Sequence, residues 1–63
     1  MDQYSTHEKS EMLFNEGVYL YEHEQFEKAE KKFLEALELN PQSEEILYNL
    51  ALVYLEQKKI DLC

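Results

Sequence analysis

Few side chains in this sequence could bind a metal or act as a nucleophile, and they lie apart. His23 and Glu27 stand four residues apart, which is the spacing of two zinc ligands on one turn of a helix. Two exposed ligands do not complete a zinc site, and Cys63 has no neighbouring base that would activate its thiol. The sequence contains no glycine-rich phosphate loop. We therefore expect no metal site, no cofactor and no enzymatic activity.

The charge balance restricts the partners. Fourteen acidic residues outnumber six basic ones, giving a formal net charge of −8, which repels nucleic acids and anionic membranes. The basic cluster of Lys28, Lys31 and Lys32 stands among acids, and the Glu24–Lys28 and Glu27–Lys31 spacings predict ion pairs on one helix. We interpret this cluster as a solvated helix face. No apolar run approaches the roughly 20 residues of a membrane span, so neither nucleic acid nor a membrane is an expected partner.

The composition favours a small, ordered helical protein. With 44% apolar residues, five Tyr, three Phe and one Gly, the chain differs from a disordered tail. At 63 residues it lies near the lower limit for a self-sufficient core, so a partner or very good helix packing is expected. The single Cys and the absence of a recognisable signal peptide predict a reducing, cytoplasmic location.

Apolar periodicity predicts an all-α fold. Ser5 to Glu8 has the form of a capping box, and the stripes that follow predict a first helix over about 7–22. A polar turn separates it from a second helix over about 26–39, which Asn40-Pro41 should end with Asn40 in the left-handed conformation. Short connections between successive helices imply antiparallel neighbours.

A third helix is predicted from Glu44 to at least Gln57, with Ser43 as its N-cap. Nothing in Lys58-Lys59 breaks a helix, so whether it continues toward Cys63 stays open. The expected core comprises Gly17 and Ala29 at a close approach of the first two helices. It also includes two larger sets, Phe26, Ala29, Phe33, Ala36 and Leu37 on the second helix and Ile46, Leu50 and Val53 on the third.

Residues 11–22 and 45–56 carry one pattern, repeated after 34 residues. Identical residues recur at four positions, as Glu11 and Glu45, Leu13 and Leu47, Asn15 and Asn49, and Glu22 and Glu56. A fixed period of this size is typical of stacked helical repeats, in which one unit cannot bury its apolar face alone.

The spacing of the motif residues resembles the tetratricopeptide (TPR) repeat family. These residues are Leu13, Gly17, Leu20, Phe26, Ala29, Phe33, Ala36 and Pro41. The resemblance implies an α-solenoid of about 1.5 repeats, with an N-terminal segment and helix start over 1–9, a complete unit over 10–43 and a partial unit over 44–63. It further implies a non-catalytic module for protein–protein interaction, which would serve as a scaffold.

Two departures from the family pattern are informative. Where the family has a bulky apolar residue before the Gly, this chain has Glu16, so the stripe Met12, Glu16 and Tyr19 is expected to form an outer surface at an end of the stack. The turn between the first two helices carries Glu24 where the family often has Gly.

The resemblance also implies a concave peptide-binding surface on the first helix of each repeat. Its candidate residues are Phe14, Val18, Tyr21, Tyr48, Asn49, Leu52 and Leu55. Acidic margins at Glu11, Glu22, Glu45 and Glu56 suit a peptide or amphipathic helix with Lys or Arg beside apolar anchors. Of the side chains with which some members grip a C-terminal carboxylate, only Asn49 is present.

The alternative is a structural unit that self-assembles through its third helix. That helix is apolar on nearly every side and must be covered all round. Residues with no evident cover in the chain are Leu47, Ala51, Tyr54, Ile60 and Leu62. A homo-oligomer would cover them, with or without exchange of a segment between chains; a further helix absent from this sequence is the other explanation.

Overall fold

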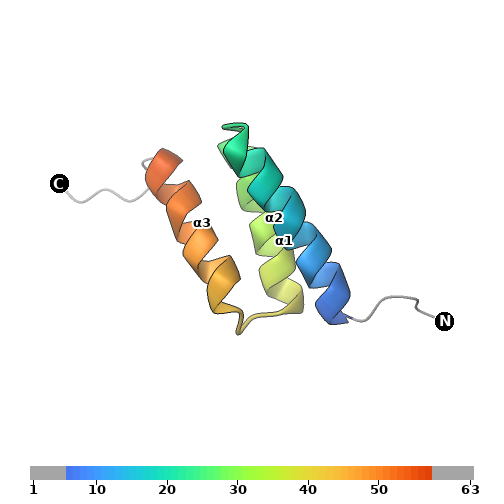
Figure 1. The fold of residues 1–63 in the computed structure, drawn as a ribbon. Helices are drawn as coiled ribbons and strands as arrows, with labels where there is room; N and C mark the ends of the chain where they lie inside the picture. The colour runs from blue at the N-terminus through green and yellow to red at the C-terminus, as the bar shows by residue number, and fades with distance from the viewer. Residues whose placement is uncertain (1–5, 58–63) are drawn as a thin grey trace.

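Three α-helices joined by two short turns make up the computed structural model, which describes residues 6–57 (Figure 1). The helices are α1 (Thr6–Glu22), α2 (Phe26–Leu39) and α3 (Glu44–Gln57). Successive helices run antiparallel, so α1 and α3 point the same way, and α2 contacts both of them. The predicted all-α fold is confirmed. Whether the third helix continues through Lys58 concerns residues that lie outside the described range.

The turn between α1 and α2 is closed by backbone hydrogen bonds around a left-handed residue. Glu24 has φ 64°, the one positive φ of a non-glycine residue within residues 6–57. The N–H of Glu24 donates to the carbonyl of Tyr21 at 3.0 Å, and the N–H of Gln25 donates to the carbonyl of Leu20 at 2.9 Å. These two bonds define a Schellman motif, whose left-handed position strongly favours Gly. Glu24 therefore occupies a backbone conformation that costs an L-residue about 1–2 kcal/mol.

The turn between α2 and α3 differs from the prediction at its first residue. Asn40 has φ −141° and ψ 76°, so the expected left-handed cap is wrong. Its N–H still donates to the carbonyl of Ala36 at 2.9 Å, and the ring of Pro41 then pushes the preceding residue toward extended backbone. The predicted N-cap is confirmed, because the Oγ of Ser43 accepts a hydrogen bond from the N–H of Ile46 at 3.3 Å.

The core lies between α2 and its two neighbours. Its buried apolar residues are Ala29, Phe33 and Ala36 from α2 and Ile46, Leu50 and Val53 from α3. Burial of the three α3 residues was predicted and is confirmed. Phe26 and Leu37, also predicted to be buried, are only half-buried.

Gly17 and Ser10 bring α1 onto α2. Gly17 is buried, and a Cβ added to it would lie 2.6 Å from Cε1 of Phe33, so the missing side chain makes room for the Phe33 ring. The sequence predicted a packing role for Gly17 but named Ala29 as its partner. The hydroxyl of Ser10, which the sequence did not single out, is buried and donates to the carbonyl of Ala36 at 3.0 Å. Ser10 lies three residues before Leu13 and seven before Gly17, on the same side of α1. That spacing could have identified it as a buried position.

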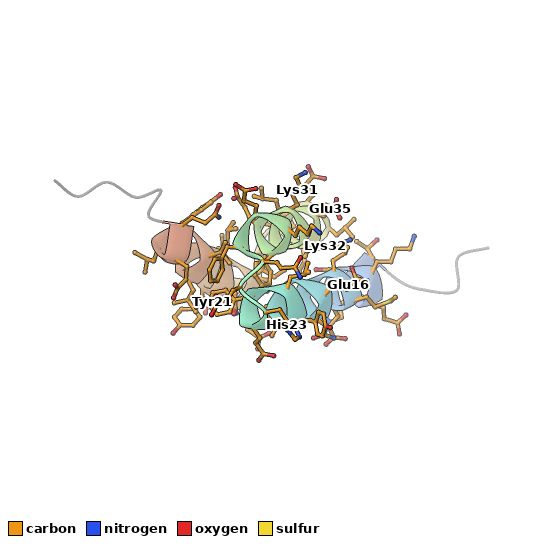
Figure 2. All side chains as sticks on the ribbon, turned by 90° about the horizontal axis from the view of Figure 1, so that it is seen from above. Glu16, Tyr21, His23, Lys31, Lys32 and Glu35 are labelled. Carbon is orange, nitrogen blue, oxygen red and sulfur yellow. The ribbon has the colours of Figure 1, made fainter. Side chains whose placement is uncertain are left out.

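An ion pair joins α1 and α2 on the outer surface. Nζ of Lys32 lies 3.2 Å from a carboxylate oxygen of Glu16, and Figure 2 shows the two side chains on the same flank of the helix pair. Within residues 6–57 the predicted Glu24–Lys28 and Glu27–Lys31 pairs do not form. Glu24 cannot pair as a helical residue because it belongs to the turn. Met12 and Tyr19, beside Glu16, are 51% and 61% exposed, as the outer-surface prediction required.

Candidate functional site

The side chains predicted to bind a peptide lie on α1 and α3, and together they are called the α1–α3 surface. The members are Phe14, Val18, Tyr21, Tyr48, Asn49, Leu52 and Leu55. The α1 members are half-buried and pack against the core. On α3, Tyr48 is 66% exposed and Leu55 is 54% exposed, whereas Leu52 and Asn49 between them are half-buried. The surface thus has a fixed aromatic half on α1 and a largely unpacked half on α3.

Ring contacts fix the aromatic half. The Phe14 ring lies 5.7 Å from the Phe33 ring, centroid to centroid and tilted by 50°. The Tyr21 ring meets the Phe26 ring edge to face at 5.5 Å. These contacts pack both rings against α2, so a ligand would meet a preformed apolar wall.

Tyr21 also links α1 to α3 at one end of the surface. Its hydroxyl donates to Oε2 of Glu56 at 3.5 Å, and Figure 2 shows Tyr21 on the side of α1 that faces α3. The pKa of Tyr21 is raised above its ordinary value of 10.0. Partial burial is the larger cause, and the negative charge of the nearby Glu56 carboxylate is the second. The hydrogen bond is long and the carboxylate is exposed, so we infer that this hydrogen bond is weak. A cationic group of a partner could replace the Tyr21 hydroxyl as the donor to Glu56.

At the other end, a small hollow of about 50 Å³ separates α1 from the start of α3, and Glu11, Phe14 and Glu45 lie along it. All four predicted acidic margins, Glu11, Glu22, Glu45 and Glu56, are exposed. Helix α3 contains no basic residue within its bounds. The amide of Asn49 donates to the carbonyl of Glu45 at 2.8 Å, so its donor group is used within its own helix.

The residues predicted to self-associate are placed differently from one another. Leu47 is 47% exposed and Ala51 is exposed, whereas Tyr54 is half-buried and packs against the core of its own chain. Ile60 and Leu62 lie outside the described residues. The sequence treated this set as separate from the peptide surface. On the helix, Leu47 and Ala51 adjoin Tyr48 and Leu55, so the exposed apolar side of α3 is continuous.

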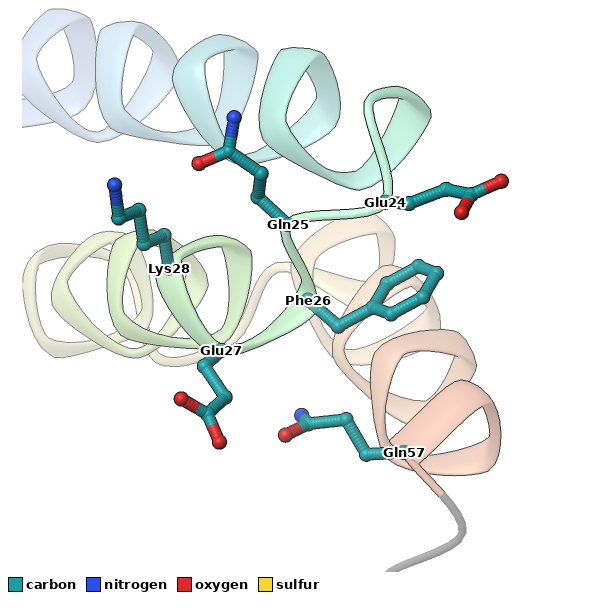
Figure 3. Close-up of a pocket in the computed structure, with 6 residues that line it drawn as sticks. All are labelled: Glu24, Gln25, Phe26, Glu27, Lys28 and Gln57. Carbon is teal, nitrogen blue, oxygen red and sulfur yellow. The ribbon is translucent and has the colours of Figure 1, made fainter.

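A second hollow lacks a convergent set of side chains. A depression of about 480 Å³ between the start of α2 and the end of α3 is lined by Glu24, Gln25, Phe26, Glu27, Lys28 and Gln57. Figure 3 shows these side chains pointing in different directions rather than toward a common point. His23 stacks against Tyr19, with ring centroids 4.2 Å apart, and within residues 6–57 no three His, Cys, Asp or Glu side chains converge on a metal position. None of the three described helices combines the length and apolarity that crossing a bilayer requires.

Comparison with known proteins identifies the family. A family model described as the TPR repeat matches residues 17–58, which is two thirds of the chain and runs from the middle of α1 past the end of α3. Neither the curated proteins nor the solved structures gave a match. The matched segment contains the Gly17–Phe33 contact and all six residues of the buried core. The chain therefore belongs to the TPR repeat family, whose repeats generally mediate protein–protein interactions.

Proposed function

We propose that this chain is a non-catalytic interaction module that binds a peptide or amphipathic helix on its α1–α3 surface. The observation that carries the proposal is the exposure of Tyr48 and Leu55, which are 66% and 54% accessible beside a preformed aromatic wall. Large apolar side chains gathered on one face of a small protein mark an interface. Exposed aromatic residues of this kind supply much of the affinity when a partner buries them.

The charges around the surface specify the partner's chemistry. Exposed carboxylates of Glu11, Glu22, Glu45 and Glu56 border it, and α3 offers no cation in return. A partner with Lys or Arg beside its apolar anchors would be attracted to this border, and an acidic partner would be repelled. Glu56 is the carboxylate best placed to receive such a cation, because it already accepts a hydrogen bond from Tyr21 at the edge of the apolar patch.

A peptide-display selection with random sequences tests the proposal. Random peptides of about 16 residues are selected on the wild-type protein, and their affinities are then measured for two variants. Tyr48→Ala combined with Leu52→Ala should weaken binding about tenfold or more, while Tyr19→Ala, which removes an equally exposed tyrosine from the outer surface, should leave it unchanged. Helical content measured by circular dichroism checks that the double variant still folds. Selected peptides that bind both variants as they bind the wild type would refute the proposal.

A second candidate function is structural self-assembly through α3. The specific observation in its favour is the continuous exposed face that Leu47 and Ala51 form with Tyr48 and Leu55. Light scattering coupled to size exclusion, over a wide concentration range, separates the candidates. A folded species that stays at the chain mass of 7.6 kDa throughout would exclude self-assembly.

A further inference from the structure

The outer flank of α1 and α2 carries two hollows that do not belong to the α1–α3 surface. The first, of about 360 Å³, is lined by Lys9, Met12, Leu13, Glu16 and Leu39. The second, of about 420 Å³, is lined by Asn15, Glu16, Tyr19, Leu20 and Lys32. Because Glu16 lines both hollows, they are neighbours, and together they are called the α1–α2 groove.

Each hollow combines apolar side chains with one lysine. In the first hollow Met12 is 51% exposed and Leu39 is 37% exposed, and in the second Tyr19 is 61% exposed. Large apolar side chains that gather at one place on a surface mark an interface. The α1–α2 groove can therefore receive two apolar anchors of a partner, one in each hollow.

The charge of the groove is opposite in sign to that of the whole molecule. In a chain with a formal net charge of −8, the residues that line the groove carry two lysines, Lys9 and Lys32, against one acid, Glu16. Within residues 6–57 Lys9 forms no ion pair. Lys32 lies 3.2 Å from Glu16, but its ammonium group has three N–H donors and can bind a second carboxylate. Acidic side chains beside the two anchors would therefore complement the groove.

The acidic border of the α1–α3 surface lies on another side of the molecule. Figure 2 shows Glu16 and Lys32 on the side of the helix pair away from α3, whereas Tyr21 faces α3. Around α1, Glu11 lies about 160° from Lys9, because two residues turn the helix by about 200°. Charges more than about 8 Å apart are largely screened at physiological salt. The α1–α3 surface and the α1–α2 groove therefore favour partners of opposite charge.

The separation of the two hollows specifies a helical occupant. Leu13 and Leu20, one in each hollow, stand seven residues apart, which is about 10 Å along α1. Side chains seven residues apart on a partner helix span the same distance and lie on one face. In an extended peptide about 10 Å corresponds to three residues, whose side chains point to opposite faces.

We propose that the α1–α2 groove binds an acidic amphipathic helix of a partner protein. Apolar side chains seven residues apart on that helix enter the two hollows, and carboxylates beside them meet Lys9 and Lys32. This inference goes beyond the proposed function because it adds a second surface with the opposite charge preference. One chain would then hold a basic partner and an acidic partner at the same time.

The test uses two display libraries of helical peptides, each about 16 residues long, that differ only in charge. Both libraries have fixed leucines seven residues apart. One library carries Glu beside each leucine, the other carries Lys, and the remaining positions are random. Both are selected on the wild-type protein, and fluorescence anisotropy then measures the affinity of the selected peptides for variants. A Glu library that yields no binder would overturn the proposal.

Lys9→Glu tests the charge contact. It should weaken peptides of the Glu library about tenfold or more, because a like charge replaces the unpaired cation. Lys31→Glu makes the same charge change at an exposed position of α2 outside the groove and should leave their affinity unchanged. Replacing a Glu of the peptide by Lys should restore its affinity for Lys9→Glu. Glu-library peptides that bind Lys9→Glu as they bind the wild type would contradict the proposal.

Leu39→Ala tests the apolar contact independently of charge. Leu39 lines the first hollow and is 37% exposed, and Leu34, on the same helix but outside the groove, is 39% exposed. Leu39→Ala should weaken peptides of the Glu library about fivefold or more, and Leu34→Ala should leave them unchanged. Circular dichroism checks that both variants keep their helical content. Equal effects of the two variants would overturn the proposal.

The outcomes separate this inference from the proposed function. Tyr48→Ala combined with Leu52→Ala should leave peptides of the Glu library unchanged. Glu-library peptides that this double variant weakens would bind on the α1–α3 surface, which would refute the groove and leave the proposed binding surface in place. Peptides of the Lys library that Lys9→Glu and Leu39→Ala leave unchanged, but the double variant weakens, would support the proposed function alone.

Discussion

The Phe33 ring occupies the space that a side chain at Gly17 would fill, with its Cε1 atom 2.6 Å from the position of an added Cβ. Phe33 is fully buried, so its neighbours in the core restrict any shift of the ring. This contact lets α1 approach α2 closely, and Phe14 of the α1–α3 surface packs on the same ring.

Gly17→Ala should destabilise the protein although alanine is the better helix former. The helix gain of about 1 kcal/mol is offset by an overpacking cost of about 1–3 kcal/mol, so we expect a net loss of about 1 kcal/mol. Urea unfolding followed by circular dichroism measures it. In combination with Phe33→Leu the loss should be smaller than the sum of the two single losses. Full additivity, or stabilisation by Gly17→Ala, would contradict the contact.

Glu24→Gly should stabilise the protein. Glycine adopts the left-handed conformation of φ 64° without a Cβ penalty, and the gain, after the extra freedom of the unfolded chain, is about 0.5–1 kcal/mol. Glu22→Gly, at the last residue of α1, serves as the control and should cost about 0.5–1 kcal/mol. If both variants lose stability in thermal unfolding, the turn does not have the Schellman geometry.

Ser43→Ala should cost about 1 kcal/mol, because it removes the oxygen that caps the N–H of Ile46 at the start of α3. The neighbouring exposed variant Gln42→Ala should change the free energy of unfolding by less than about 0.5 kcal/mol. Amide hydrogen exchange provides a second measurement, since the first turn of α3 should lose protection before α1 does. Equal effects of the two variants would count against the cap.

Tyr21→Phe should change how stability responds to alkaline pH. The folded pKa of Tyr21 lies above the unfolded value of 10.0, so folding favours the neutral phenol, and this contribution is fully present below pH 10.0 and lost as the pH rises through the folded pKa. Wild type should therefore lose stability more steeply than Tyr21→Phe above that pH. Urea unfolding of both proteins over the range provides the comparison, and parallel curves would show that folding does not raise the pKa of Tyr21.

Much of this fold could be predicted from the sequence because strong local signals agreed with the packing. The apolar stripe of Ile46, Leu50 and Val53 predicted the buried face of α3, and Ser43 marked its start. The ends of the helices followed from caps and turn residues. The predicted conformation of Asn40 was wrong because two preferences compete there. Asn tolerates the left-handed conformation at the end of a helix, but the ring of Pro41 disfavours helical values at the preceding residue.

Contacts between helices were harder to predict than the helices themselves. Spacing within one helix suggested Glu27–Lys31, yet the ion pair that forms joins Glu16 to Lys32 across two helices, and such a choice depends on side-chain reach in three dimensions. For the same reason the sequence-based prediction assigned Leu47 and Leu55 to two separate sites. The two side chains lie on one exposed face, and this follows only once it is known which side of α3 is buried.

The affinity of one display-selected peptide for three proteins tests whether the α1–α3 surface is the binding surface. Calorimetry is carried out on wild type, the Tyr48→Ala/Leu52→Ala double variant and the Tyr19→Ala control. We expect the double variant to bind about tenfold more weakly or worse, and Tyr19→Ala to bind as the wild type does. A peptide that binds the double variant with wild-type affinity, but loses affinity for Tyr19→Ala, would show that the peptide binds on the outer surface of α1 and not on the α1–α3 surface.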